Sequence, residues 1–250
     1  MMPSRNPILT VCFYFLLCSL ITAGAGASQS TQETPARVGD AYPLNVCAVT
    51  GNPLGANPVV VILSGMPKEE LNGREVRFCC GGCKGTFDAD PIASNKKLDE
   101  MIIADQLKVY PAGTCIVMED EMMTDPTGPD ARKDKNLVIG NRLYRLCCKS
   151  CVRRFKKNQE QYRKVLDERI IKEQAAKYPL EVCVITGRPY GESPFELVVA
   201  NRLVRTCCGG CGQGVRNNPG AAIQKLQEAD SSKASTSESK KTGTIRGVDS

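Results

Sequence analysis

A cysteine motif, C-C-x-x-C, occurs three times in this 250-residue chain and constrains its fold more than any other feature. It lies in the segments VRFCCGGCKGTF, YRLCCKSCVRRF and VRTCCGGCGQGV. A lone cysteine precedes each copy, and these lone cysteines, Cys47, Cys115 and Cys183, recur at one constant interval. A fixed period is typical of repeated structural units. The sequence therefore predicts three tandem modules.

Each module is expected to be small and of mixed structure. The β-branched runs PVVVIL and FELVVA indicate strands, and Asn72-Gly73 predicts a two-residue hairpin turn. The glycine pairs Gly81-Gly82 and Gly209-Gly210 predict a tight turn after the cysteine pair, with a helix following. The predicted fold class is α+β, a tandem array of three small β-hairpin-plus-helix metal-binding modules joined by helical linkers. The modules are placed at 42–91, 109–158 and 177–226, with linkers at 92–108 and 159–176.

The second linker shows the helical pattern most clearly. Tyr162, Leu166 and Ile170 lie at helical spacing, and Glu160 and Lys164 form an i,i+4 pair of opposite charge. This helix is expected to end near Tyr178-Pro179. The segment 229–250 is rich in Ser, Lys and Thr, and we expect it to be disordered because it cannot bury a core.

The N-terminal segment 1–27 has the pattern of a secretory signal peptide. Arg5 gives a basic start, an apolar run follows, and AGAGA at 23–27 offers small residues for cleavage. The apolar run is shorter than the roughly 20 residues that a membrane span needs. The mature protein is therefore expected to be exported, periplasmic or extracellular, with no membrane span after signal cleavage. Cys12 and Cys18 leave with the signal, so twelve cysteines remain.

Charge and composition argue against two classes of function. The chain has 33 basic and 27 acidic residues, mixed along its length, and its aromatic content is 5%. A nucleic-acid interface would need a basic face with interleaved aromatic residues, so nucleic acid is not an expected partner. The chain has no His, and no Ser or Asp lies in a recognisable nucleophile or acid–base setting, so we expect no enzyme.

Metal binding accounts for the cysteine pattern best. Thiolates spaced C-x-x-C can converge on one ion, and a distant cysteine can complete the site. Thiolate-only sites favour soft cations, so the expected cofactor is Zn²⁺ or Cu⁺, about three per chain. Metal ions are the expected partners, with an envelope protein as a second candidate. The predicted ligands are Cys47, Cys79, Cys80, Cys83, Cys115, Cys147, Cys148, Cys151, Cys183, Cys207, Cys208 and Cys211.

Two details of these sites remain open. Adjacent strand residues point to opposite faces, so Cys79 and Cys80 can share an ion only where the strand has ended. Cys47 and Cys83 are therefore stronger candidates than either member of the pair. Three arginines just before the pairs, Arg77, Arg145 and Arg205, are candidates to offset thiolate charge from the second shell, or they lie on a solvated strand face.

Disulfides are the main alternative for the cysteines. Export and an even number of mature cysteines favour them, and the protein would then be a disulfide-stapled interaction or scaffold protein. A bond between neighbouring cysteines strains the peptide, so each member of a pair would need a separate partner. Redox catalysis through C-x-x-C is less favoured, because it needs a thioredoxin-like βαβ setting and a thiol at a helix start.

The modules resemble the TRASH/YHS group of small cysteine-rich metal-binding domains. Those domains close with a strand ending in Phe-Cys, a further cysteine, and a helix with Phe and Pro. The first copy matches this close, the second has Leu146 in place of the Phe, and the third is the most divergent. The matching residues are Phe78, Cys79, Cys83, Phe87 and Pro91, then Cys147, Cys151 and Phe155, then Cys207, Cys211 and Pro219.

The copies also depart from the family pattern. TRASH/YHS domains open with a turn that holds two cysteines. The second of these is replaced by Thr50, Met118 and Thr186 in the three copies. The extra cysteine of each pair could replace that ligand, and Met118 could add thioether character suited to Cu⁺. The resemblance implies heavy-metal binding in a sensing, trafficking or resistance role, and it implies no enzyme.

Overall fold

The computed structural model describes residues 35–130 and 134–242, with side chains described up to residue 233. The predicted signal peptide at 1–27 lies outside this range. The described residues all belong to one compact unit. Among them, no helix is long and apolar enough to cross a membrane.

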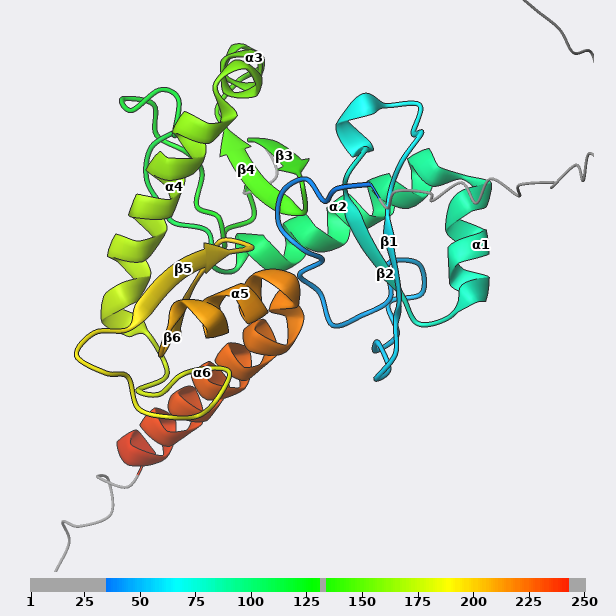
Figure 1. Cartoon of the computed structure of the whole chain (residues 1–250). Coiled ribbons are helices and arrows are strands. Elements are labelled where there is room, and N and C mark those ends of the chain that lie inside the picture. The colour runs from blue at the N-terminus through cyan, green and yellow to red at the C-terminus, as the bar shows by residue number, and fades with distance from the viewer. Residues whose placement is uncertain (1–34, 131–133, 243–250) are drawn as a thin grey trace, which may run out of the picture. The chain divides into compact units, whose positions relative to one another are not determined.

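Three antiparallel hairpins are the β structure of this range (Figure 1). The first pairs β1 (Val59–Ile62) with β2 (Glu75–Phe78), and the second pairs β3 (Lys135–Ile139) with β4 (Arg142–Leu146). The third pairs β5 (Phe195–Val199) with β6 (Arg202–Thr206). Each two-stranded sheet stands alone. The prediction of an α+β chain with three small hairpins is confirmed, and the arrangement is compatible with three tandem modules.

A short helix and then a longer one follow each hairpin. The short helices are α1 (Gly81–Ala89), α3 (Lys149–Lys157) and α5 (Gly209–Asn217). The longer ones are α2 (Pro91–Leu107), α4 (Gln159–Gln174) and α6 (Pro219–Thr242), and there are two 3₁₀ turns, η1 (Glu69–Leu71) and η2 (Ala175–Lys177). Asp90 caps α2 by accepting a hydrogen bond from the Ala93 amide at 2.9 Å, and Pro91 occupies the first helical position.

The hairpin turns differ between modules. Gly140-Asn141 and Ala200-Asn201 each form a two-residue turn with positive φ at both positions, as type I′ hairpins require. The prediction of such a turn at Asn72-Gly73 is wrong. β1 ends at Ile62, the η1 turn intervenes, and the Gly73 amide donates to the Leu63 carbonyl at 2.8 Å. The Asn-Gly pair instead ends a long loop, in which the Asn72 side chain accepts from the Met66 amide at 2.9 Å.

The lone cysteine and the cysteine pair are equally far apart along the chain in modules 1 and 2, although the two modules differ in this way. Strands β1 and β5 begin equally far along the chain from Cys47 and Cys183, whereas β3 begins later relative to Cys115. Module 1 therefore carries its extra residues within the hairpin, and module 2 carries them before it. Module 3 carries neither insertion, so its lone cysteine and its cysteine pair lie closer together along the chain than in the other two modules.

The predicted disorder of segment 229–250 requires a second correction. α6 continues through Thr242, while residues 243–250 lie outside the described range. A helix can persist without a core because its backbone hydrogen bonds are local. Ser231 and Ser232 add side-chain hydrogen bonds of 2.8 Å to the carbonyls of Gln227 and Glu228, one turn earlier. Composition correctly suggested that residues such as 230–233 are exposed, but exposure does not exclude a helix.

Each module has its own hydrophobic cluster. Phe78 and Phe87 meet edge to face in module 1, with ring centroids 5.3 Å apart. In module 2 the ring centroids of Tyr144 and Phe155 are 4.4 Å apart. The cluster of module 3 is built mainly from smaller aliphatic residues. Helix α2 belongs to two clusters, because Leu98 and Ile102 pack in module 1 whereas Leu107 packs in module 2. The segments expected to be linkers are therefore helices that form part of the cores.

The modules are also joined by a repeated polar contact. The Asn141 side chain accepts from Arg74 Nε at 2.9 Å and donates to the Glu75 carbonyl at 2.8 Å. Asn201 makes the same two contacts one module later, with Arg142 Nε and the Leu143 carbonyl, both at 2.8 Å. Each turn asparagine thus docks its hairpin onto the second strand of the preceding module.

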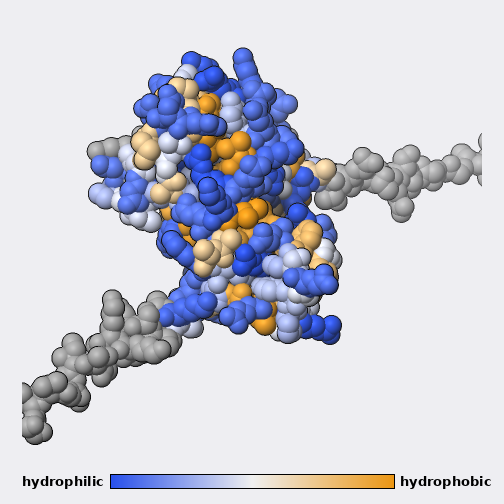
Figure 2. Space-filling model, turned by 90° about the vertical axis from the view of Figure 1, so that its left-hand side faces the viewer, coloured by the Kyte–Doolittle hydropathy of each residue, from blue (hydrophilic) through white to orange (hydrophobic). Residues whose placement is uncertain are grey.

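Polar and charged residues cover much of the surface. Figure 2 shows one face on which hydrophilic residues surround small hydrophobic patches. The exposed large hydrophobic residues among those described are Val38, Val60, Met122, Ile185 and Phe195. They lie in the segment that precedes module 1 and in all three modules.

Candidate metal centres

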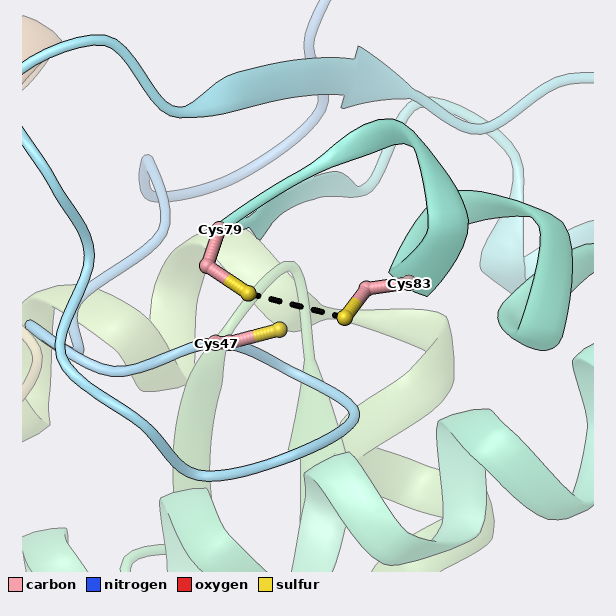
Figure 3. A group of neighbouring side chains, drawn as sticks. All are labelled: Cys47, Cys79 and Cys83. Atoms are coloured by element: carbon pink, nitrogen blue, oxygen red, sulfur yellow. Dashed lines mark hydrogen bonds between the residues drawn. The ribbon is translucent and has the colours of Figure 1, made fainter.

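Three cysteine sulfurs come together in every module. Within each group all three Sγ atoms lie within 4.8 Å of one another. In module 1 the side chains of Cys47, Cys79 and Cys83 point toward a common centre, from a loop, the end of β2 and helix α1 (Figure 3). We call these groups triads. They are Cys47/Cys79/Cys83, Cys115/Cys147/Cys151 and Cys183/Cys207/Cys211.

The lone cysteine of each triad lies in a tight turn closed by an isolated β-bridge. In module 1 the Cys47 amide donates to the Asn52 carbonyl at 2.7 Å, and the Gly51 amide donates to the Cys47 carbonyl at 2.9 Å. Gly51 has a φ of 75°, a conformation that favours glycine. The Ala48 amide donates to the Arg77 carbonyl at 3.1 Å, which attaches this turn to β2. The turn thereby holds the Cys47 sulfur beside the end of the strand.

The other two cysteines come from the junction between strand and helix. Cys79 directly follows β2, Cys80 is the N-cap of α1, and Cys83 lies in the first turn of that helix. The Sγ atoms of Cys79 and Cys83 are 3.5 Å apart, and the matching distances in modules 2 and 3 are 3.5 and 3.7 Å. The glycines after the pair begin the helix and do not form the separate turn that the sequence predicted. The C-C-x-x-C spacing therefore brings its first and last cysteines together.

Backbone amides favour a negative charge on the lone cysteine. Burial by itself raises the pKa of the Cys47 thiol, but hydrogen bonds from the amides of Thr50, Cys79 and Val49 outweigh it and bring the pKa to about 6. The pKa of Cys183 is lowered to about 6 in the same way, with the Thr186 side chain contributing, and the pKa of Cys115 is also lowered. Each triad thus contains one sulfur whose surroundings stabilise the thiolate.

The helix cysteine behaves in the opposite way. A hydrogen bond to Cys79, together with burial, raises the pKa of Cys83 to about 12. A hydrogen bond to Cys207, together with burial, does the same for Cys211. In module 2 burial comes first and raises the pKa of Cys151 to about 11. A triad therefore combines a sulfur that favours the thiolate with one that favours the thiol, and a cation bound by both would displace the thiol proton.

The second cysteine of each pair lies outside the triads. Cys80 and Cys208 are exposed and Cys148 is half-buried. The Cys80 Sγ is 3.7 Å from the Cys83 Sγ, the Cys208 Sγ is 4.0 Å from the Cys207 Sγ, and the Cys148 thiol is 3.0 Å from the Ser150 hydroxyl. Of the twelve predicted ligands, the structure brings nine into triads and leaves these three at helix N-caps.

The three arginines pair with carboxylates. Arg77, Arg145 and Arg205 form ion pairs with Glu75, Asp134 and Glu196 at 2.8, 2.7 and 2.8 Å. Each of these guanidinium groups therefore has a carboxylate partner in its own module. The prediction that they offset thiolate charge stays a prediction.

A repeated tyrosine is the feature that sequence reasoning missed. The Tyr110 hydroxyl accepts from the Arg145 amide at 3.0 Å, and the Tyr178 hydroxyl accepts from the Arg205 amide at 2.8 Å. The guanidinium groups of these arginines lie over the same rings at 5.6 and 4.9 Å. These contacts attach the opening of a module, and so its lone cysteine, to its second strand. The available signal was that Tyr42, Tyr110 and Tyr178 recur at the same interval as the lone cysteines.

Thr186 and Met118 stand where TRASH/YHS domains have the second cysteine of the opening turn. Neither residue belongs to a triad. The Thr186 hydroxyl is 3.9 Å from the Cys207 Sγ. The Met118 sulfur accepts a hydrogen bond of 3.2 Å from Arg154 Nη1. The nearby Met122 is 71% exposed. No direct thioether contribution to a triad is therefore seen among the described contacts.

The donor set decides which ions fit. Three sulfurs within bonding reach of one point suit soft or borderline cations such as Zn²⁺ and Cu⁺, and they do not suit hard cations that prefer oxygen. The three cysteine triads could therefore hold metal ions. No protein-family model, curated protein or solved structure matches this chain.

Proposed function

We propose that this chain is an exported, non-enzymatic metal-binding protein that holds one thiolate-bound ion, Zn²⁺ or Cu⁺, in each triad. One observation carries the proposal. Three separate sets of sulfurs converge to within 4.8 Å, each from two segments far apart in the sequence. Such sites support a role in heavy-metal binding, sensing or trafficking. The resemblance to the TRASH/YHS domains supports the same role on the motifs quoted above.

The convergence of three sulfurs on one point favours metal over disulfides. A metal ion can use all three sulfurs of a triad together, whereas disulfides join them in pairs. In module 1 the exposed Cys80, 3.7 Å from Cys83, would have to take part for every cysteine to be paired. The opposed pKa shifts of Cys47 and Cys83 also fit a set of sulfurs in which a cation replaces the thiol proton. The disulfide-stapled scaffold is therefore the weaker candidate.

Export and the lack of catalysis rest on the sequence. The signal-like segment at 1–27 supports a periplasmic or extracellular location. An envelope protein would be found in the same compartment and is therefore a candidate partner. The absence of His, and a donor set made wholly of thiolates, support binding in place of hydrolysis.

Mass measurement tests the proposal directly. The secreted mature protein is purified without added reductant and its mass is recorded under native conditions and then after acid unfolding. We expect three metal adducts that vanish in acid and leave the mass of twelve free thiols. A metal-free native protein whose mass is short by two hydrogens per disulfide would establish the stapled scaffold instead.

A single substitution tests the assignment of ligands. Cys83→Ser removes one sulfur from the first triad, and we expect it to leave two ions bound. Ser64→Ala, on the exposed hairpin loop of the same module, is the control and should keep all three. Retention of three ions by Cys83→Ser would contradict the triad as the binding site.

A further inference from the structure

The cysteines at the helix N-caps do not cap their helices through their side chains. Cys80 and Cys208 are exposed, and none of the three N-cap cysteines makes a side-chain capping hydrogen bond. Serine is one of the best N-cap residues, so a change from cysteine to serine at these positions should maintain the helix. The repeated presence of cysteine here is therefore unexplained by stability.

In modules 1 and 3 the sulfurs of these cysteines nevertheless lie beside the triads. The Cys80 Sγ is 3.7 Å from the Cys83 Sγ, and the Cys208 Sγ is 4.0 Å from the Cys207 Sγ. In each case the neighbouring sulfur belongs to a triad whose lone cysteine is buried. Cys80 is thus exposed to solvent, and its sulfur lies next to a sulfur of the triad.

From this placement we propose that Cys80 and Cys208, together with Cys148 at the matching helix N-cap of module 2, are exchange ligands, through which a soft metal ion enters and leaves each triad by thiolate substitution. The role rests on the proposed metal-binding function and specifies the partner, a donor or acceptor that presents its own thiolates. As the N-cap sulfur binds the ion, its proton passes to solvent. When the acceptor's thiolate takes the ion, the chain's cysteines regain protons, and no atom changes oxidation state.

A site with three sulfurs is suited to this exchange. Four-thiolate zinc sites are closed and structural, whereas a site with three protein ligands keeps a position open. An additional thiolate that occupies the open position only transiently offers a low-energy route between the buried sulfurs and an external ligand. The buried lone cysteine would then be the last to release the ion.

The three modules differ in how open this route is. Module 2 is the most enclosed, because Cys148 is half-buried and contacts the Ser150 hydroxyl. Module 3 is the most open, because Cys208 is exposed and both Cys207 and Cys211 are half-buried. We expect metal to exchange fastest at module 3 and slowest at module 2.

The test compares adjacent cysteines in the full chain. The wild type is loaded with the ion that the mass measurement identifies, Zn²⁺ or Cu⁺. Its transfer to an excess of a chromogenic chelator is followed by stopped flow. Replacing Cys80, Cys148 and Cys208 together by Ser should keep three ions, change their affinity by less than about tenfold and slow their release about tenfold or more. The matched variant Cys79→Ser, at the neighbouring position, should lose its ion or bind it about 100-fold more weakly.

Two results would overturn the role as exchange ligands. If the triple variant loses its ions as Cys79→Ser does, the N-cap cysteines are structural fourth ligands, and X-ray absorption would count four sulfurs per ion in the wild type. If release is unchanged, these cysteines take no part in exchange. A wild-type chain that holds no ion would be a separate failure, of the metal-binding function itself.

Discussion

Asn141 and Asn201 show how much a single residue decides in this chain. Each occupies a left-handed position in a hairpin turn, with φ of 64° and 59°, and each is fully buried. Asparagine tolerates this conformation better than most residues, and its amide also supplies one donor and one acceptor to the preceding module. The turn requirement and the interface requirement thus fall on the same side chain.

Substitution of Asn201 separates the two requirements. Asn201→Gly keeps the backbone conformation but leaves Arg142 Nε and the Leu143 carbonyl without this partner, so we expect a loss of about 2–4 kcal/mol in unfolding free energy. Asn201→Ala should lose about 1–2 kcal/mol more, because alanine is strained at positive φ. Urea denaturation measures both values. Equal stability of the Gly and Ala variants would contradict the strain argument.

Helices α2 and α4 do more than connect one module to the next. Gln106, in the last turn of α2, accepts from the Leu143 amide at 2.8 Å and donates to the Asn141 carbonyl at 2.9 Å. Gln174, at the end of α4, accepts from the Leu203 amide at 2.8 Å and donates to the Asn201 carbonyl at 3.0 Å. Each helix therefore fixes the hairpin turn of the next module.

Burial should determine the cost of losing these glutamines. Gln106 is fully buried, whereas Gln174 is partly exposed, although both bind a hairpin in the same way. Gln106→Leu should destabilise the chain by about 3 kcal/mol, because buried backbone groups lose their partners. Gln174→Leu, the matched control, should cost about 1 kcal/mol, because water can replace the lost contacts. The midpoints of denaturant unfolding give both values, and a larger loss for Gln174→Leu would rule out this explanation.

Every module contacts both others in the whole molecule. The Asn141 and Asn201 contacts join module 1 to module 2 and module 2 to module 3. Arg77 in module 1 donates to the Asn218 side chain at 2.7 Å and to the Asn217 carbonyl at 2.9 Å, which joins module 1 to module 3. The modules that the sequence presents as separate units are therefore connected in all three pairs.

We expect these contacts to make unfolding cooperative. Metal-free protein in scanning calorimetry should show one transition, with a calorimetric enthalpy equal to the van't Hoff enthalpy. Separate transitions, with a calorimetric enthalpy well above the van't Hoff value, would mean that the modules unfold independently. Asn201→Gly provides a comparison, since weakening one interface should broaden or split the transition.

The repeat, the three hairpins with their helices, and the soft character of the donor atoms follow from the sequence alone, because periodicity and residue chemistry are local properties. Which cysteines converge is different. It depends on β2 ending at Phe78 and α1 beginning at Gly81, so that Cys79 and Cys80 lie in the junction between them and only the Cys79 sulfur joins the triad. The sequence could state this condition but could not resolve it.

Tertiary structure also decided where the insertions lie and how the modules join. Equal spacing of the lone cysteines is satisfied by an insertion within the first hairpin or before the second, because spacing counts residues and not their path. The joining contacts link residues such as Arg74 and Asn141, far apart along the chain, and their polar groups could equally face water in an isolated module. Only packing of the modules buries them, so only the folded chain shows that Asn141 and Gln106 hold it together.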